Sequence, residues 1–336
     1  MTESLNQVEL IYIFLSLSII FLFFFFFSNI SKTLNIFDKP NEKRKIHSEN
    51  IPSIGGFLFF SIFLLYGLTA LFFDIKSDFF LFNKQIFVII FCSSLIFFFG
   101  ILDDKVNIGS LKKSIFFIII ILIFISNDKD STIYFIRFGT LDKVFALDNF
   151  TFLFTVFCIF AFMNFFNMYD GINLQSGLYL FFLSLLFIIK NIEVIFFISI
   201  VIALIFFLFF NYKNKIFLGN GGAYFLSFLF SIFFIKSNLI LSKVSTEEIL
   251  ILMIIPGLDM LRLFVSRLIK GQSPFLADSN HIHHLFLKKY SNTQTALLIF
   301  SLTFIPYLAF TYLKLFYIIL FIQLAIYVFS VQYFRK

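Results

Sequence analysis

Apolar runs of about 20 residues recur along the whole 336-residue chain and are separated by short polar segments. A helical run of this length matches the hydrocarbon thickness of a bilayer. The expected spans are 8–28, 54–74, 86–102, 113–127, 150–166, 176–189, 192–211, 221–236, 246–265, 295–313 and 315–334. The pattern predicts an all-α polytopic membrane protein with about eleven transmembrane helices, forming one integral membrane domain over residues 1–336.

Positive charge is distributed unequally between the two sets of loops. The loops after odd-numbered spans, together with the C-terminus, hold 17 of the 26 Lys and Arg residues. Cytoplasmic loops carry the excess of Lys and Arg, so we expect this set to be cytoplasmic, with the N-terminus outside and the C-terminus inside. The first run, Leu10 to Phe27, follows Glu3 and Glu9 rather than a basic segment, which indicates an uncleaved first span.

One external segment departs from the helical pattern. Residues 133–146 carry strand-forming side chains on both sides of a turn signal near Gly139, so we expect a small periplasmic β-hairpin there. The composition, 60% hydrophobic and 13% charged, agrees with a membrane protein. The net charge of +7 suits anionic lipids and phosphate ligands. Basic residues are dispersed over short loops, so no nucleic-acid binding is expected.

The most distinctive polar segment follows the fifth span. Asn164, Asn167 and Asp170 are spaced at i, i+3 and i+6, which places them on nearly one face of a helix, and Gly171 then breaks it. Polar residues at this depth are costly and indicate a functional site. The alternative is that Asp170 and Asn173 only cap helices.

A second candidate is the pair Asp103 and Asp104, directly after the third span. Two adjacent carboxylates at a membrane boundary are either solubilising charges or an acid/base or metal-linked pair, since neighbouring like charges raise one pKa. In the fourth loop, Gly219, Asn220 and two further glycines precede a span. This glycine cluster is either a phosphate-binding helix start or a plain turn.

Basic residues mark the remaining two loops. Arg44, Lys45 and His47 lie in the first loop, where the alternative interpretation is a simple positive-inside anchor. The longest loop carries three of the four histidines and a preceding arginine, namely Arg267, His281, His283 and His284. Arg and His together suit a phosphate-bearing ligand. The histidine spacing also suggests zinc, but no further His or Cys lies nearby to complete a closed site.

Taken together, these loops resemble the polyprenyl-phosphate N-acetylhexosamine-1-phosphate transferases of glycosyltransferase family 4. The matching positions, from about residue 38 to 285 and in the family's order, are Asp38, Pro40, Arg44, Lys45, His47, Gly55, Gly56, Asp103, Asp104, Asn164, Asn167, Asp170, Gly171, Phe217, Gly219, Gly222, Asp259, Arg267, Ser273, Pro274, Phe275, Asp278, His281, His283 and His284. The His-Ile-His-His form resembles the undecaprenyl-phosphate GlcNAc-1-phosphate transferase branch, which starts O-antigen and related surface glycans.

The chain departs from this family at several positions. Asn220 stands where the family has an Asp that looks like a magnesium ligand in relatives. Asn173 replaces a frequent second Asp, and Leu174-Gln175 replaces the usual Gly-Leu. Asn107 replaces a third acidic residue that some members carry after the Asp pair.

The resemblance implies a bacterial inner-membrane enzyme that transfers an N-acetylhexosamine-1-phosphate from a UDP-sugar to a polyprenyl (undecaprenyl) phosphate and releases UMP. It implies Mg²⁺, or Mn²⁺ in its place, as cofactor. We expect catalytic roles for Asp103, Asp104 and Asp170, and metal contacts from Asn167, Asp170 and Asn220. The substrate-binding set is Asn164, Asn167, Arg44, Lys45, His47, Gly219, Arg267, His281, His283 and His284.

Three alternatives are left open. A catalytically impaired relative, acting as a membrane scaffold or ligand sensor, would be consistent with Asn in place of Asp at position 220. A transporter would place charges within the spans and often shows repeats, whereas here the charges gather at the cytoplasmic span ends. A homodimer is compatible with the sequence but is not indicated by it.

Overall fold

The computed structural model describes residues 7–38, 40, 49–73, 79–80, 82–273 and 280–335. Ten of the described helices are long and apolar enough to cross a membrane, and α6 (Gln175–Ile189) is a shorter apolar helix. The ten are α1 (Gln7–Leu34), α2 (Gly55–Phe72), α3 (Asn83–Val106), α4 (Ser110–Asn127), α5 (Thr151–Tyr169), α7 (Val194–Tyr212), α8 (Gly219–Leu239), α9 (Thr246–Ile269), α11 (Asn292–Leu313) and α12 (Phe316–Arg335). The prediction of an all-α polytopic membrane protein is confirmed.

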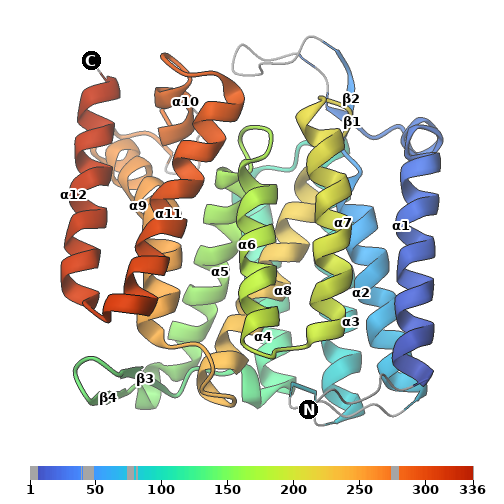
Figure 1. Cartoon of the computed structure of the whole chain (residues 1–336), viewed down its shortest axis with the longest axis horizontal. Coiled ribbons are helices and arrows are strands. Elements are labelled where there is room, and N and C mark those ends of the chain that lie inside the picture. The colour runs from blue at the N-terminus through green and yellow to red at the C-terminus, as the bar shows by residue number, and fades with distance from the viewer. Residues whose placement is uncertain are drawn as a thin grey trace.

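The long helices stand side by side in one bundle (Figure 1). The start of α1 and the end of α12 lie at opposite ends of the bundle, as an odd number of crossings requires. The short helix α10 (Ile282–Phe286) and the two-stranded pair β1 (Phe37–Asp38) and β2 (Ile51–Pro52) lie at the end where α12 finishes. We call this the α10 end of the bundle.

The expected hairpin is present at the other end of the bundle (Figure 1). Strands β3 (Phe135–Phe138) and β4 (Lys143–Ala146) pair antiparallel, with short 3₁₀ turns, η1 (Lys129–Ser131) and η2 (Asp148–Phe150), on either side. Its turn is attached to the first turn of α9, because the backbone N–H and hydroxyl of Thr140 both donate to Glu247 Oε1, at 2.8 and 3.0 Å. The hairpin is thus a fixed part of the fold.

Helix α8 lies at the centre of the bundle and is buried along most of its length, from Gly221 to Ser237. Phenylalanine rings on this helix fill the surrounding space; Phe225, for example, packs edge-on against Phe60 and Phe97 from α2 and α3. Because α8 is enclosed on all sides, its first turn is fixed relative to the ends of its neighbours.

Several helices extend further than the apolar pattern indicated. Helix α3 continues to Val106, so Asp103 and Asp104 belong to its last turns and not to a loop. Helix α5 continues to Tyr169, and α8 already begins at Gly219. The expectation of a loop is therefore wrong for Asp103, Asp104, Gly219 and Asn220, whereas Asn164 and Asn167 lie on a helix as expected. Backbone hydrogen bonding continues the helix after the apolar run has ended.

Candidate functional site

A seam of glycines brings the start of α8 against α2 and α3. A Cβ atom on Gly56 would lie 2.4 Å from the Cα of Gly222, and one on Gly100 would lie 2.5 Å from the Cα of Gly221. Such contacts are open only to residues without a side chain. The backbones of α2, α3 and α8 therefore touch directly. Asn220, the residue before Gly221, is thereby held beside the end of α3.

Asp103 is fully buried and already has three donors. Lys113 Nζ lies 2.7 Å from its Oδ2, the Nδ2 of Asn220 lies 2.9 Å from the same oxygen, and the N–H of Ile108 donates to Oδ1 at 2.8 Å. The ammonium neutralises the carboxylate, and the two other donors fix its orientation. Asp103 thus links the end of α3 to α4 and to α8.

Asp104 has a different environment, although it is the next residue. Its two carboxylate oxygens accept from the backbone N–H of Asn220, at 3.1 and 3.0 Å, and its side chain is only half-buried. Gly219 completes this corner with φ +77°, a conformation that favours glycine. A Cβ there would lie 2.5 Å from the carbonyl oxygen of Ser53. We call Asp103, Asp104, Lys113, Gly219 and Asn220 the acidic cluster.

The glycine-rich segment is used for packing in this geometry, and its interpretation as a phosphate-binding helix start stays a prediction. The N–H of Asn220 is taken up by Asp104, and Gly221 and Gly222 contact the backbones of α3 and α2. The glycines therefore serve helix packing, and they position Asn220 through it.

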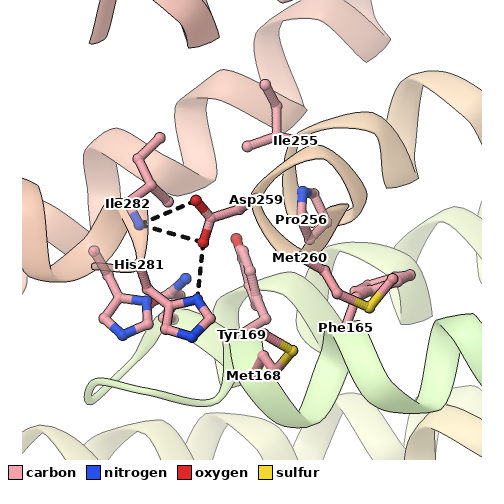
Figure 2. A pocket seen from close by; sticks show the side chains of 11 residues that line it. Phe165, Met168, Tyr169, Ile255, Pro256, Asp259, Met260, His281 and Ile282 are labelled. Atoms are coloured by element: carbon pink, nitrogen blue, oxygen red, sulfur yellow. Dashed lines mark hydrogen bonds and ion pairs between the residues drawn. The ribbon is translucent and has the colours of Figure 1, made fainter. Parts of the chain in front are cut away.

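The second group of candidate residues is organised by Asp259, which is buried near the middle of α9. Its Oδ2 lies 2.9 Å from Nδ1 of His281, and the N–H of Ile282 donates to both of its oxygens (Figure 2). Arg262 Nη2 donates to Oδ1 at 2.8 Å and to the carbonyl of Asn280 at 2.7 Å. These bonds fix the start of α10, and with it the histidines.

The rings of the three histidines of this segment lie against one another. The rings of His281 and His283 are parallel with centroids 5.3 Å apart, and the ring of His284 lies 4.4 Å from that of His283. A Cβ on Gly171 would lie 2.3 Å from Nε2 of His283, so this ring lies against the turn that follows α5. Burial, together with the neighbouring histidines, lowers the pKa of His283 well below its usual value. His283 is therefore neutral at pH 7.

Asp170 follows α5 immediately and lies next to Gly171 in this turn. Burial raises the pKa of its carboxyl to about 6, and the hydrogen bond from the Ser176 hydroxyl opposes that rise. Asp170 is the C-cap residue of α5. Among the described hydrogen bonds, none joins its side chain to the end of that helix. We call Asp170, Gly171, Asp259, His281, His283 and His284 the histidine cluster.

A small cavity lies beside Asp259 and His281, between the end of α5, α9 near Pro256, and α10 (Figure 2). Its wall combines apolar side chains with the polar groups of the histidine cluster. The lining residues are Phe165, Met168, Tyr169, Gln175, Ile255, Pro256, Asp259, Met260, His281, Ile282 and His283.

The remaining predicted residues are distributed as follows. Asn164 donates to the carbonyl of Phe160 in its own helix, at 2.8 Å, and Asn167 is half-buried one turn later. Arg267 is buried near the end of α9. The predicted site residues Arg44, Lys45 and His47 lie outside the described residues, as do Pro274, Phe275 and Asp278.

Two positions that depart from the family pattern have structural roles. Asn173 is not the cap residue of α5 or α6; its amide donates to the carbonyl of Asn211, in the last turn of α7, and to Oδ1 of Asn214. Leu174 has φ +70°, a conformation that a β-carbon disfavours, and its N–H donates to Oδ1 of Asn211. The side chain of Asn211 therefore anchors the turn between α5 and α6.

The described residues contain no group of three or more His, Cys, Asp or Glu side chains close enough to hold a metal ion. The zinc interpretation of the histidines therefore has no support within this part of the chain. The donors fit Mg²⁺ better, because this ion prefers oxygen ligands and usually binds through one or two carboxylates together with substrate phosphates. Asn220 directs its amide nitrogen to Asp103, which leaves its carbonyl oxygen as the atom suited to a cation.

Sequence reasoning did not assign three residues that bond to the carboxylates of these clusters. Lys113, Arg262 and Tyr327 each bond to a candidate carboxylate, at 2.7, 2.8 and 3.1 Å. The spacing of Arg262 from Asp259, three positions along a helix, is a signal that could have identified this pair. Lys113 and Tyr327 come from other helices, and no local pattern indicates them.

Comparison with known proteins finds relatives of this chain by sequence. The model of glycosyl transferase family 4 matches residues 86–238. Relatives named undecaprenyl-phosphate alpha-N-acetylglucosaminyl 1-phosphate transferase occur in Salmonella typhi (26% identical, covering 88% of this chain and 80% of the relative) and in Escherichia coli O157:H7 (28%, covering 81% and 75%). Another, from Thermotoga maritima, is 27% identical and covers 82% of each chain. Over residues 86–238 the chain is therefore similar to glycosyl transferase family 4.

Proposed function

We propose that this protein transfers an N-acetylhexosamine-1-phosphate from a UDP-sugar to undecaprenyl phosphate. A phosphate oxygen of the lipid forms a bond to the β-phosphorus of the UDP-sugar, and the bond from that phosphorus to the oxygen of UMP breaks. The products are lipid-diphosphate-sugar and UMP. We further propose that the product starts a cell-surface glycan of the O-antigen type and that the protein lies in a bacterial inner membrane with its C-terminus in the cytoplasm.

One observation carries this proposal: the acidic and histidine clusters are both built at the α10 end of the bundle, from residues widely separated in sequence. The charge bias of the loops assigns this end to the cytoplasm, where nucleotide sugars are available. The relatives' names supply the chemistry, since each is a transferase of N-acetylglucosaminyl 1-phosphate.

The two clusters suit different parts of the reaction. Asp104 is half-buried and carries no described cation partner. We therefore propose that it acts on the lipid phosphate, either as a general base or as a metal-linked carboxylate. Asp103 is neutralised by Lys113, so its role is to hold Asn220 in place. We assign the diphosphate of the UDP-sugar to His281 and Arg267, where charge-assisted hydrogen bonds would be effective.

We assign the cation to Asn167, Asp170 and Asn220, all of which offer oxygen atoms. Mg²⁺ bound there would neutralise the diphosphate and stabilise the charge that develops on departing UMP. Asp170 must be ionised to serve as a ligand, and with a pKa of about 6 it is ionised at neutral pH.

The test is UMP release by the purified protein from a panel of UDP-N-acetylhexosamines, with undecaprenyl phosphate and graded Mg²⁺ or Mn²⁺. We expect activity with at least one sugar and its loss in EDTA. Absence of UMP release from every sugar at every metal concentration would contradict the proposal.

A second function, a non-catalytic scaffold or sensor, is favoured by one observation, the amide at position 220. The variant Asn220→Asp separates the two. It places a carboxylate 2.9 Å from the oxygen of Asp103, so we expect Mg²⁺ to raise its unfolding midpoint more than that of the native protein. An enzyme should need less Mg²⁺ for half-maximal activity after this change. If the native protein is inert and the Asn220→Asp variant is active, the result supports the non-catalytic scaffold or sensor.

A further inference from the structure

The last helix, α12, is tied directly to the histidine cluster. The hydroxyl of Tyr327 donates to Oδ1 of Asp259 at 3.1 Å and accepts from Nε of Arg262 at 2.9 Å. Tyr327 is buried, with 4% of its surface exposed. It lies outside the residues that the family model matches, and no motif indicated it.

The bonds to Asp259 determine which nitrogen of His281 faces outward from this network. An ionised carboxylate only accepts hydrogen bonds, so the contact with Nδ1 of His281 requires a proton on that nitrogen. In the neutral ring, Nε2 is then the unprotonated atom; in the charged ring, it is a second donor. The carboxylate therefore orients the ring and selects its tautomer.

Tyr327 and Arg262 in turn restrain that carboxylate. Oδ1 of Asp259 receives both the tyrosine hydroxyl and the guanidinium, while Oδ2 receives His281. Rotation of the carboxylate away from His281 would break all of these bonds together. Arg262 also donates to the carbonyl of Asn280, one residue before His281.

A second set of contacts joins α12 to the other end of α10. The ring of Phe334 packs against Phe286 with centroids 4.7 Å apart, and the ammonium of Lys289 lies 4.0 Å from the centroid of Tyr333. Helix α12 thus supports α10 at both ends, by hydrogen bonds near His281 and by ring contacts beyond His284.

We propose that Tyr327 and Asp259 are positioning residues for His281, and that α12 is thereby part of the active-site framework. This inference rests on the proposed function, in which His281 contacts the diphosphate of the UDP-sugar. Both side chains act through His281. Their loss should therefore lower the rate of transfer more than it weakens substrate binding, because misorientation of a contacting group acts mainly in the transition state.

The kinetic test compares Tyr327→Phe and Asp259→Asn with Tyr317→Phe, which removes a hydroxyl from an exposed residue of the same helix. We expect kcat to fall about 10- to 100-fold in Asp259→Asn, by analogy with carboxylates that orient a metal-ligating histidine. In Tyr327→Phe, which keeps the carboxylate, we expect a fall of about 3- to 10-fold. KM should change less than about threefold in both, and Tyr317→Phe should match the native protein.

Two kinetic outcomes would overturn the inference. One is unchanged kcat in both Tyr327→Phe and Asp259→Asn. The other is a fall in kcat that is matched by an equal fall in the amount of folded protein, which would indicate a purely structural role. Thermal unfolding of each variant in the same detergent distinguishes the second outcome from positioning.

Amide hydrogen exchange tests the network without any activity. The N–H of Ile282 is bonded to Asp259, so its exchange should accelerate in Tyr327→Phe and Asp259→Asn but not in Tyr317→Phe. Unchanged exchange in both variants would show that Tyr327 does not restrain this segment. If exchange responds but the native protein releases no UMP from any UDP-sugar, the network stands and the proposed function fails.

Discussion

Asp103 and Asp104 are adjacent in sequence, but their surroundings separate their roles. The carboxylate of Asp103 is fully buried and paired with Lys113, whereas that of Asp104 is half-buried and accepts the backbone N–H of Asn220. A carboxylate that is already neutralised and triply bonded is poorly placed to take a proton from a substrate. A partly exposed one is better placed, which gives the two residues different expected mutational effects.

We predict that Asp104→Asn abolishes turnover while leaving the fold intact. The amide oxygen can still accept from Asn220, but the charge is gone, and general-base contributions are about 10²–10⁴-fold. Asp103→Asn should instead lower the unfolding midpoint, because it leaves Lys113 without its partner, at a cost of about 1.5–3 kcal/mol. UMP release and thermal unfolding measure the two effects. Asp142→Asn, in the hairpin, is the matched control, and equal behaviour of both variants would refute the distinction.

The pKa of Asp170 gives a second prediction at this scale. Its folded-state pKa, about 6, lies above the ordinary value of 3.8, so the protonated form stabilises the fold. That contribution is complete below about pH 4 and is lost as the pH rises through 6. The ionised form is the one proposed to bind the cation, so kcat/KM should rise with pH through about 6.

The check is a pH–rate profile of the native protein beside Asp170→Asn. The variant has no titratable group at this position, so the limb near pH 6 should vanish from its residual activity. The stability of the variant relative to the native protein should also be greater at pH 8 than at pH 4. The reason is that no buried charge forms at position 170 of the variant as the pH rises. A profile that keeps the same limb in Asp170→Asn would assign the titration to another group.

At the scale of elements, the glycine seam of α2, α3 and α8 determines where Asn220 lies. A methyl group on Gly56 or Gly100 would press on the backbone of α8 at 2.4–2.5 Å, so the helices must separate. We predict that Gly56→Ala and Gly100→Ala each destabilise the fold by about 1–3 kcal/mol and lower turnover more than tenfold, since small displacements of contacting groups are costly to catalysis.

Gly257→Ala is the control for these variants. Gly257 lies within α9 and has nothing within 4 Å of the position that a Cβ would occupy. Alanine there should leave activity unchanged and raise helix stability slightly. Thermal unfolding and UMP release should therefore separate the seam glycines from Gly257. Similar behaviour of all three variants would mean that packing at the seam does not position the site.

The elements also show how far sequence reasoning extends. Apolar length predicts the helices, because each span must satisfy its backbone within itself. It does not predict that α3 continues through Asp104 to Val106, or that Gly221 and Gly222 contact other helices, since both depend on tertiary packing. The resemblance identified Asp103, Asp259 and His281, but it could not show that Asp103 pairs with Lys113 or that His281 pairs with Asp259. These pairings depend on the contacts of four different helices or loops.

At the scale of the whole molecule, the hairpin and the two clusters lie at opposite ends of the bundle (Figure 1). This requires that α6 crosses as well, although its 15 residues span only about 22 Å. The bilayer hydrocarbon is about 30 Å thick, so α6 is too short to cross it alone. Its buried side chains, among them Tyr179 and Phe187, show that it crosses within the bundle, where protein and not lipid surrounds it.

Cysteine labelling tests this arrangement and its orientation together. Asp142 is exposed in the hairpin, and Lys213 is exposed directly after α7, at the α10 end of the bundle. A membrane-impermeant maleimide added to intact cells should label Asp142→Cys but not Lys213→Cys, and lysis should make both reactive. The native cysteines provide a low background, since Cys92 is buried and Cys158 half-buried within helices.

Labelling of Lys213→Cys but not Asp142→Cys in intact cells would invert the orientation that the positive charges indicate. Labelling of both positions from outside would contradict the odd number of crossings, and with it the separation of hairpin and site.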